Sequence, residues 1–403
     1  MSRISLEEAI TRALGAATLV ATEPLPLAQL SGRVLAEDLD FGADLPPFDH
    51  AAMDGYAIAG AAPSDAAFSV VGESRAGAPA SEADRRFAMT ISTGAAIPPG
   101  LDTVVPWEDV SREGDRITLR REARAGQHVR KAGEDARRGT RALSRGTRLS
   151  ARHVALLATL ERDHAVVSTR PRVAILCTGD ELRDPGSAPR PGSIVDSNGP
   201  MLAALVAQGG GAPVRHRVPD TREAVHDALS GALDDAELVI TIGGAADGVH
   251  DHVMPTLESL GAETLFRGVA IKPGKPVALA RSTRGDRVVP VLALPGNPGS
   301  AFVTFTLIGL PLLRAMQGDL RPRPRTSFAR AARAMKGAAD REVLAYGAIH
   351  AESEGTHEVF VPAPSATSGS IPGLASASAI AIVPAGTSLA EGELARVIEV
   401  ERA

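Results

Sequence analysis

The feature that most constrains this chain is a regular alternation of apolar runs and amphipathic segments across residues 172–316. Apolar runs of strand length occur at Val173–Cys177, Leu238–Ile242 and Val288–Leu294. Between these runs the apolar residues recur at helical spacing, which predicts helices at Gly199–Gln208, Arg222–Leu233 and His252–Leu260. Because parallel strands need crossover connections, this pattern predicts a doubly wound, mostly parallel α/β sheet.

The segments on either side of this α/β region have a different character. Ser5 and Glu8 form a candidate capping box for an N-terminal helix, and a second helix is expected at Ala151–Leu160. Residues 41–148 are rich in Gly and Pro, and we expect strands at Phe68–Val71, Ala88–Ser92, Thr103–Trp107 and Arg116–Arg120. After a Pro/Arg linker at residues 321–325, β-like alternation returns. The Ser/Ala/Gly-rich stretch 365–379 predicts a loop.

Composition narrows the classes of function. Hydrophobic residues make up 44% of the 403 residues and charged residues 23%, a globular balance that predicts two or three domains. The 3% aromatic content and the net charge of −5 disfavour nucleic-acid binding. Residues 111–152 hold thirteen Lys or Arg against five Asp or Glu, which we interpret as a solvated face, with nucleic-acid binding as the alternative. Cys177 is the only cysteine, so the sequence excludes an internal disulfide and a thiolate metal cage.

Neither an export signal nor a membrane span is expected. The N-terminal residues lack the long apolar core of a signal peptide. The longest apolar stretch, Ala301–Leu313, is shorter than the ~20 residues that a membrane span requires. We therefore expect a cytoplasmic protein with neither a membrane nor a nucleic-acid partner.

Lysine is rare in this chain and unevenly placed. Of 43 basic residues only four are lysine, and two of these, Lys272 and Lys275, lie in one five-residue string, Lys-Pro-Gly-Lys-Pro. A compact ammonium group binds small anions differently from a planar guanidinium group. The string is therefore a candidate anion site, with chance as the alternative.

Three predicted strands end in glycine-bearing loops, at residues 178–181, 242–248 and 294–298. In an open parallel sheet, ligands bind outside the carboxyl ends of the strands, and glycine-rich turns present backbone amides that suit phosphate. The chain has no P-loop and no G-x-G-x-x-G motif, so ordinary nucleotide- and dinucleotide-binding classes are disfavoured. Three such loops together predict a phosphate-bearing ligand.

Acidic residues occur close to the same loops. Asp180 and Glu181 follow one strand, Asp220 lies at a predicted helix start, and Asp251 follows the second loop. Carboxylates beside a phosphate repel it unless a hard cation such as Mg²⁺ bridges them. For Asp220 the alternative is that it merely caps its helix. The histidines show no zinc-site spacing, and no nucleophile–base arrangement is evident.

Specific motifs extend this interpretation. The segment from Pro46 to Ala57, PPFDHAAMDGYA, resembles the signature of the molybdopterin molybdenumtransferases, the MoeA and gephyrin E-domain family. Supporting strings occur in family order along the whole chain: Thr93-Gly-Ala, Ala132-Gly-Glu-Asp135, Thr178-Gly-Asp-Glu-Leu182, Asp196-Ser-Asn198, Gly243-Gly244 with Asp251, Lys272-Pro-Gly-Lys-Pro276 and Leu294-Pro-Gly-Asn-Pro298.

The resemblance implies a homodimer of four-domain subunits with an active site shared between subunits. The implied domains are an N-terminal helical part (1–45 and 148–170), a β-rich insertion (46–147), a MogA-like molybdopterin-binding α/β domain (171–320) and a small C-terminal β-barrel (321–403). It also implies insertion of molybdenum from molybdate into adenylylated molybdopterin, with release of AMP and help from Mg²⁺. The implied protein partners are the molybdopterin adenylyltransferase and apo-molybdoenzymes.

Family motifs assign roles residue by residue. Catalytic roles are implied for Asp54, Asp135, Glu181, Asp220 and Asp251, and three of these, Glu181, Asp220 and Asp251, are the implied Mg²⁺ ligands. Substrate binding is implied for Thr93, Gly179, Asp180, Ser197, Asn198, Gly243, Gly244, Lys272, Lys275, Pro295, Asn297, Pro298 and Ser300.

The chain departs from the family pattern at five positions and in one loop. His50 and Ala51 replace Asn-Ser, Ala246 replaces a serine, Asp247 replaces an apolar residue, Gly268 replaces a common lysine, and the loop at 365–379 matches poorly. A divergent paralogue that binds a pterin or nucleotide as a non-catalytic or altered-specificity scaffold is therefore the alternative. Retention of the acids and both lysines favours the enzyme, and AMP release with and without molybdate would discriminate the two.

Overall fold

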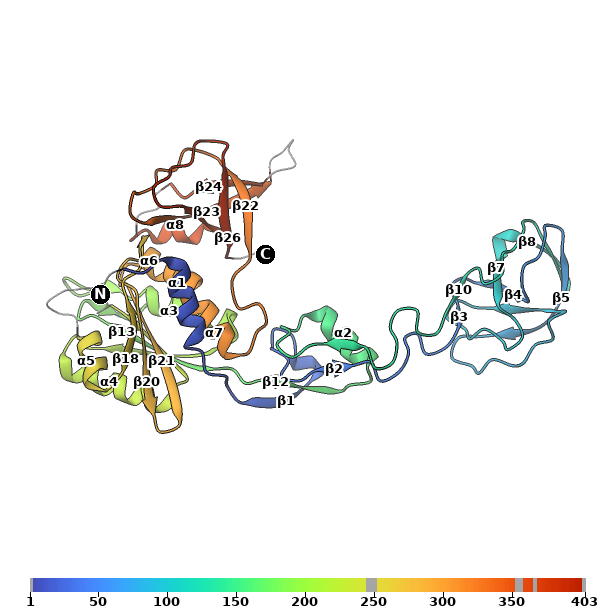
Figure 1. Cartoon of the computed structure of the whole chain (residues 1–403), viewed down its shortest axis with the longest axis horizontal. Coiled ribbons are helices and arrows are strands. Elements are labelled where there is room, and N and C mark those ends of the chain that lie inside the picture. Colours follow the sequence, from blue (N-terminus) through green and yellow to red (C-terminus); the bar gives the residue numbers. More distant parts are fainter. Residues whose placement is uncertain (1–2, 244–251, 352–357, 365–367, 401–403) are drawn as a thin grey trace. The chain divides into compact units, whose positions relative to one another are not determined.

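The computed structural model describes residues 3–243, 252–351, 358–364 and 368–400 (Figure 1). The chain divides into two compact units, one formed by Met1–Glu37 with Arg145–Ala403 and the other by Asp38–Ser144. The four-domain boundaries expected from the sequence stay a prediction.

The larger unit is built on a six-stranded sheet in the order β16-β13-β17-β21-β20-β18. Its strands are β13 (Arg172–Thr178), β16 (Ala212–Val218), β17 (Leu238–Ile242), β18 (Glu263–Arg267), β20 (Ala278–Arg284) and β21 (Arg287–Leu294). The first four in spatial order run parallel, and β20 pairs antiparallel with both β21 and β18, so only β20 runs opposite to the other five strands. The predicted mostly parallel sheet is confirmed, with an antiparallel hairpin added at one side.

Side chains alternate between two cores along each central strand. On β13, Val173, Ile175 and Cys177 belong to one buried cluster, and Ala174 and Leu176 belong to the other. The first cluster is covered by five helical elements: α1 (Leu6–Gly15), α3 (Asn198–Gln208), α6 (Pro298–Thr304), a π-helical turn η3 (Phe305–Gly309) and α7 (Leu310–Met316). The second cluster is covered by α4 (Arg222–Asp235) and α5 (Val253–Ser259). This two-sided burial explains why the strands are continuous apolar runs.

The stretch that was too short for a membrane span in the sequence becomes a longer helix in the structure. The continuous helical segment Pro298–Met316 is 19 residues long and apolar enough to cross a membrane, but 83% of its apolar window is buried within the fold. Such burial is typical of a core helix, and the two ends of the segment pack in the first core cluster.

The N-terminal helix begins as the sequence predicts. The Ser5 side chain caps α1 by accepting a hydrogen bond from the Glu8 backbone N–H at 3.1 Å. The Glu8 carboxylate pairs with Arg12 one turn later rather than returning to the cap, so only half of the expected capping box forms. After α1 the chain forms β1 (Thr22–Pro26) and the short helix η1 (Leu27–Gln29); β1 pairs with β12 (His164–Ser168), which follows α2 (Ala151–Thr159).

The C-terminal region is a closed five-stranded barrel. Its strands are β22 (Thr326–Ala331), β23 (Glu342–Ala351), β24 (Glu358–Pro362), β25 (Ala379–Val383) and β26 (Leu394–Glu399). The ring closes because β23 pairs with both β24 and β25. The predicted loop at 365–379 is partly wrong, since it contains helix α8 (Ile371–Ala375), which Ser370 caps and which buries Leu374.

The smaller unit is all-β, as the sequence predicts (Figure 1). Its main sheet has the order β7-β4-β6-β5-β9-β8, with bounds β4 (Gly55–Ile58), β5 (Ala67–Ser74), β6 (Ala88–Ile91), β7 (Thr103–Pro106), β8 (Val110–Glu113) and β9 (Arg116–Leu119). The short helix η2 (Trp107–Asp109) connects β7 to β8, and two further pairs join β3 (His50–Ala51) to β10 (Val129–Arg130) and β2 (Leu39–Asp40) to β11 (Arg141–Leu143). Tyr56, Val105 and Ile117 lie in one of its cores.

Candidate functional site

Hydrogen bonds join the loops at the carboxyl ends of the parallel strands. The Thr178 hydroxyl at the end of β13 donates to the Ile242 carbonyl at 3.1 Å, and the Gly243 N–H donates to the Leu294 carbonyl at 3.1 Å. The Asn198 side-chain amide, at the start of α3, donates to the Gly296 carbonyl at 2.7 Å. The ends of β13, β17 and β21, with Gly243 and Gly296 just beyond two of them, and the α3 start therefore form one continuous rim, as expected for a ligand site in an open sheet.

Two of these glycines have a positive φ, a backbone conformation that favours glycine. Gly243 has a φ of +89°, and a Cβ atom there would lie 2.8 Å from the Thr178 hydroxyl oxygen. Gly179 has a φ of +147°, and its Cβ would lie 2.7 Å from both carboxylate oxygens of Glu181. The absence of a side chain at Gly179 lets the Glu181 carboxylate fold back against the loop. The Gly243 N–H is already hydrogen-bonded to the Leu294 carbonyl.

The acidic residues of the first loop contact the loop after β16. The Asp220 N–H donates to Asp180 Oδ1 at 3.1 Å. Asp220 is not the helix cap: the Thr221 hydroxyl accepts the Ala224 N–H and caps α4. The capping alternative for Asp220 is therefore wrong, and its carboxylate is left for another role.

Asp251 and Gly244 lie outside the described residues. Within the described part of the chain, no three His, Cys, Asp or Glu side chains are grouped to hold a metal ion.

Two arginines that sequence reasoning missed support the acidic loop through its backbone. Arg190 Nη2 donates to the Asp180 carbonyl at 2.7 Å and to the Leu182 carbonyl at 3.2 Å, and Arg217 Nη1 donates to the Leu182 carbonyl at 3.3 Å. Arg190 reaches the loop from the turn between β14 (Leu182–Arg183) and β15 (Ile194–Val195), which pair in parallel. Only the fold could reveal this role, because nothing in the local sequence distinguishes Arg190 from other surface arginines.

The start of α3 rests on a buried aspartate that pairs with an arginine on the exposed edge strand β16. Asp196 is 3% exposed, accepts the Gly199 N–H at 2.8 Å and pairs with Arg215 Nη1 at 3.2 Å. Burial, with help from the Asp196 charge, raises the pKa of the neighbouring Cys177 to about 12, so this cysteine is a neutral thiol. Ser197 and Asn198, expected to bind substrate, are held in place by this pair.

The lysine string lies beside α6. Lys272 belongs to β19 (Ile271–Lys272), which pairs with β23 of the barrel, and Lys275 lies in the turn that follows. Gly274, between them, has a φ of +106°, and a Cβ there would lie 2.5 Å from the Thr304 methyl carbon. Both lysines are exposed, and neither forms an ion pair within the described residues.

The start of α6 also meets the barrel. The Gly299 N–H donates to the Ser368 carbonyl at 2.8 Å, and the Asn297 side chain donates to the Ser368 hydroxyl at 3.3 Å. Ser300, expected to contact substrate, is 4% exposed. Pro295 precedes this turn and Pro298 opens the helix.

The smaller unit brings its own predicted residues together. Asp54 Oδ1 accepts the Thr93 N–H at 2.7 Å, which joins the signature to the Thr-Gly-Ala string. Asp135 pairs with Arg130, whose strand β10 pairs with β3 at His50. Nearby, Asp49 accepts Lys131 Nζ at 2.8 Å, and this hydrogen bond holds the pKa of Asp49 below its usual value. The signature is therefore the centre of a polar cluster.

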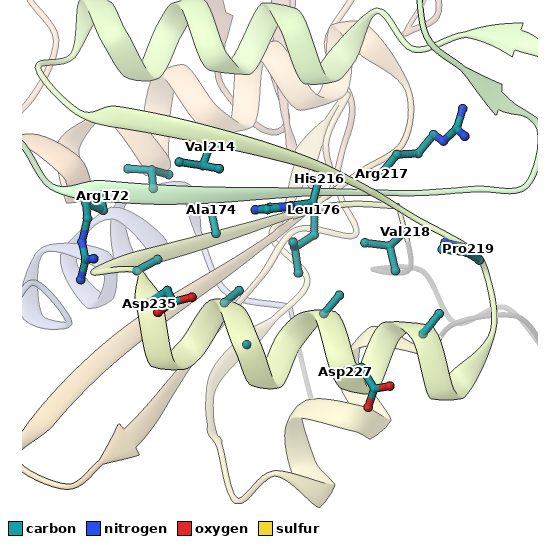
Figure 2. Close-up of a pocket in the computed structure, with 16 residues that line it drawn as sticks. Arg172, Ala174, Leu176, Val214, His216, Arg217, Val218, Pro219, Asp227 and Asp235 are labelled. Atoms are coloured by element: carbon teal, nitrogen blue, oxygen red, sulfur yellow. The ribbon is translucent and has the colours of Figure 1, made fainter.

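A cavity of about 620 Å³ lies elsewhere, along the sheet face between β13, β16 and α4 (Figure 2). Its lining is mainly small and apolar, including Ala174, Val214 and Ala228, with Arg172 and Asp235 near one end. None of the residues predicted to bind substrate lines this cavity.

Comparison with known proteins covers almost the whole chain. Residues 4–160 match the MoeA N-terminal region (domains I and II), 174–315 a probable molybdopterin-binding domain, and 328–400 the MoeA C-terminal region (domain IV). The chain belongs to the MoeA family. This family contains transferases of molybdenum cofactor biosynthesis, and the resemblance inferred from the signature is confirmed.

Individual relatives support the family assignment over the full length. A molybdopterin molybdenumtransferase from Nostoc sp. is 35% identical over 389 residues, covering 94% of this chain and 88% of the relative. Molybdopterin molybdenumtransferase 2 from Mycobacterium tuberculosis is 34% identical over 315 residues, covering 73% and 75%. A crystal structure of the MoeA protein from Pyrococcus horikoshii OT3 has a TM-score of 0.84 at 28% identity, covering 99% of this chain and 100% of that one.

Proposed function

We propose that this chain inserts molybdenum from molybdate into adenylylated molybdopterin and releases AMP. The observation that carries the proposal is the continuous rim at the strand ends, where Thr178, Asn198, Gly243 and Gly296 are joined beside the carboxylates of the first loop. The homodimer, the cytoplasmic location, and the adenylyltransferase and apo-molybdoenzymes as partners belong to the same proposal and rest on the family resemblance.

The chain's own residues suit a doubly charged anhydride. The rim offers glycine-bearing turns at which a phosphate can approach the backbone closely. The exposed Lys272 and Lys275 provide compact cations for a small oxyanion, which we take to be molybdate. Asn198, held by the Gly296 carbonyl, and Asp54, held by the Thr93 amide, are pre-oriented polar groups, so their orientation costs little when substrate binds.

Mg²⁺ is the cofactor that the proposal includes, and the carboxylates of the acidic loops are the ligand type that a hard cation prefers. Asp180 and Glu181 follow each other in one loop, and the Asp220 backbone N–H donates to the Asp180 carboxylate, so the two loops that carry these acids are adjacent. Glu181 and Asp220, together with Asp251, would hold the ion. When bound, Mg²⁺ would neutralise phosphate charge. Arg190 and Arg217 donate hydrogen bonds to the backbone carbonyls of Asp180 and Leu182, and so restrain the loop that carries the Asp180 and Glu181 carboxylates.

The decisive experiment measures AMP release from adenylylated molybdopterin with and without molybdate. We expect release to depend on molybdate for the natural chain. Asp54→Asn should retain the fold, since an amide oxygen can still accept the Thr93 N–H, but should lose about a hundredfold in turnover because the charge is gone.

Asp102→Asn is the matched control for this variant. Asp102 also accepts a backbone amide, that of Gly60 at 2.6 Å, in the same unit, and its substitution should leave turnover unchanged. A chain that binds the pterin nucleotide but releases no AMP at any molybdate concentration would be a scaffold, and the proposed reaction would be wrong.

A further inference from the structure

The chain's one tryptophan is placed at the surface. Trp107 is 53% exposed, although the chain is only 3% aromatic and buries half of its aromatic side chains, Tyr346 and Phe360 among them. Among the described residues, ring contacts and cation–π contacts join Phe48 to His50, Arg86 to Phe87 and Arg112 to Tyr56, and none involves Trp107. A large indole that contributes little to the core has a face available for a ligand.

Strand register places Trp107 next to the signature aspartate. Gly55, the first residue of β4, pairs with Pro106, the last residue of β7, and with Ile91, the last residue of β6. Asp54 precedes Gly55, Thr93 lies two residues beyond Ile91, and Trp107 follows Pro106. A Cβ at Gly55 would lie 2.9 Å from the Pro106 Cα, so the two backbones are in close contact at this point.

The backbone around Trp107 is fixed. The Val110 N–H donates to the Trp107 carbonyl to close the η2 turn, and the Arg120 N–H donates to the Asp109 carbonyl at 2.7 Å. On the neighbouring strands, the Asp54–Thr93 hydrogen bond fixes the carboxylate through Oδ1. An exposed planar ring and an oriented hydrogen-bond acceptor therefore lie on adjacent strand ends without needing rearrangement.

We propose that Trp107 is the stacking residue for the fused nitrogen heterocycle of the substrate, either its adenine base or its pterin. This inference rests on the proposed function, which requires a ligand carrying both rings. Stacking on an indole is favourable for any such ring, because each has an apolar π-face. The remaining oxygen of Asp54 can accept a hydrogen bond from a ring N–H or a sugar hydroxyl, which would select the orientation of the stacked ligand.

Because Trp107 is the single tryptophan, its fluorescence emission reports on this position alone. The full chain is titrated separately with AMP, with neopterin and with ribose 5-phosphate, and binding is measured in parallel by calorimetry. We expect AMP or neopterin to quench the emission over the same concentrations at which calorimetry detects binding. Whichever of the two quenches identifies the stacked ring, and ribose 5-phosphate, which has no base, should leave the emission unchanged.

Variants test the energetic contribution of the stack. Trp107→Leu should weaken binding of the quenching ligand about tenfold, and Trp107→Phe should restore most of that loss. Phe328→Leu is the matched control, since Phe328 is a 64% exposed aromatic side chain in the barrel. This variant should bind the quenching ligand with the same affinity as the natural chain.

Three outcomes would overturn the inference. Binding with unchanged emission and equal affinity in Trp107→Leu would remove Trp107 from the site while leaving molybdate-dependent AMP release, and hence the proposed function, intact. Emission that changes with protein concentration but not with ligand would show that a second copy of the chain covers the indole. Failure of both AMP and neopterin to bind would remove the stacked ligand itself.

Discussion

At the residue scale, the choice between lysine and arginine carries the most information. Arginine is this chain's usual cation, and many arginines form surface ion pairs, such as Arg141 with Asp38 and Arg172 with Glu237. Lys131 behaves like them, since it pairs with Asp49. Lys272, Lys275 and Lys336 are all exposed and have no ion-pair partner among the described residues, but of these three only Lys272 and Lys275 lie close together, in one string beside α6. This contrast supports an anion site at the string.

Lys272→Arg and Lys275→Arg should therefore raise the molybdate concentration for half-maximal AMP release by about tenfold or more. The planar guanidinium is larger and less strongly hydrated than an ammonium, so it fits poorly around a small oxyanion. Lys336→Arg, on an exposed site, and Lys131→Arg, where the guanidinium can keep its pair with Asp49, should not change that concentration. Four indistinguishable molybdate curves would show that lysine identity is incidental.

At the element scale, strand β4 holds the signature in place. Gly55 opens this strand between β6 and β7, and a Cβ there would lie only 2.0 Å from the Val105 carbonyl oxygen. The nearest atoms, which belong to Val105 and Pro106, are all backbone atoms, so they cannot rotate away as a side chain would. The glycine of the signature is thus explained by packing of the sheet that carries Asp54.

Gly55→Ala should destabilise the smaller unit by at least about 3 kcal/mol, which corresponds to a loss of about 10 °C or more in its melting temperature. Scanning calorimetry of the full chain measures this change. Gly42→Ala is the control, because Gly42 is exposed and no atom lies within 4 Å of the place that an added methyl group would occupy. Equal melting temperatures for the two variants would contradict the packing argument.

At the scale of the whole molecule, family membership spans both compact units. The MoeA N-terminal region covers residues 4–160, which include the smaller unit, and the other two matched regions lie in the larger one. Predicted site residues occur in both units, with Asp54 and Asp135 in one and the strand-end rim in the other. The resemblance implies that subunits share their sites in a homodimer.

Light scattering should therefore give twice the chain mass of 41.6 kDa. Mixing two inactive variants, Asp54→Asn and Glu181→Gln, should restore part of the activity if each shared site draws on both subunits. A fully active species at the mass of a single chain would refute the dimer. A dimer without complementation would refute only the sharing of sites.

Local periodicity determined the core of this fold from sequence alone, because burial on both faces requires uninterrupted apolar runs. Strands β13, β17 and β21 were predictable for that reason, helices α3 to α5 from the helical spacing of their apolar residues, and the all-β insertion from its short strand-like runs between Gly and Pro residues. Strand β16 was not, since its exposed edge position permits Arg215, His216 and Arg217 and leaves no apolar pattern. Helix α8 was hidden within a Ser/Ala/Gly-rich stretch, because its formation depends on one cap and on burying Leu374.

The chemistry divides in the same way. Motif spacing pointed to the acids, glycines and lysines of the candidate site, since residue type and order are properties of the sequence itself. Only the tertiary structure decided that Thr221 rather than Asp220 caps α4, that Arg190 supports the carbonyls of Asp180 and Leu182, and that Trp107 lies beside Asp54. Each depends on contacts between segments whose partnership is set by packing and strand register, neither of which any short stretch of sequence contains.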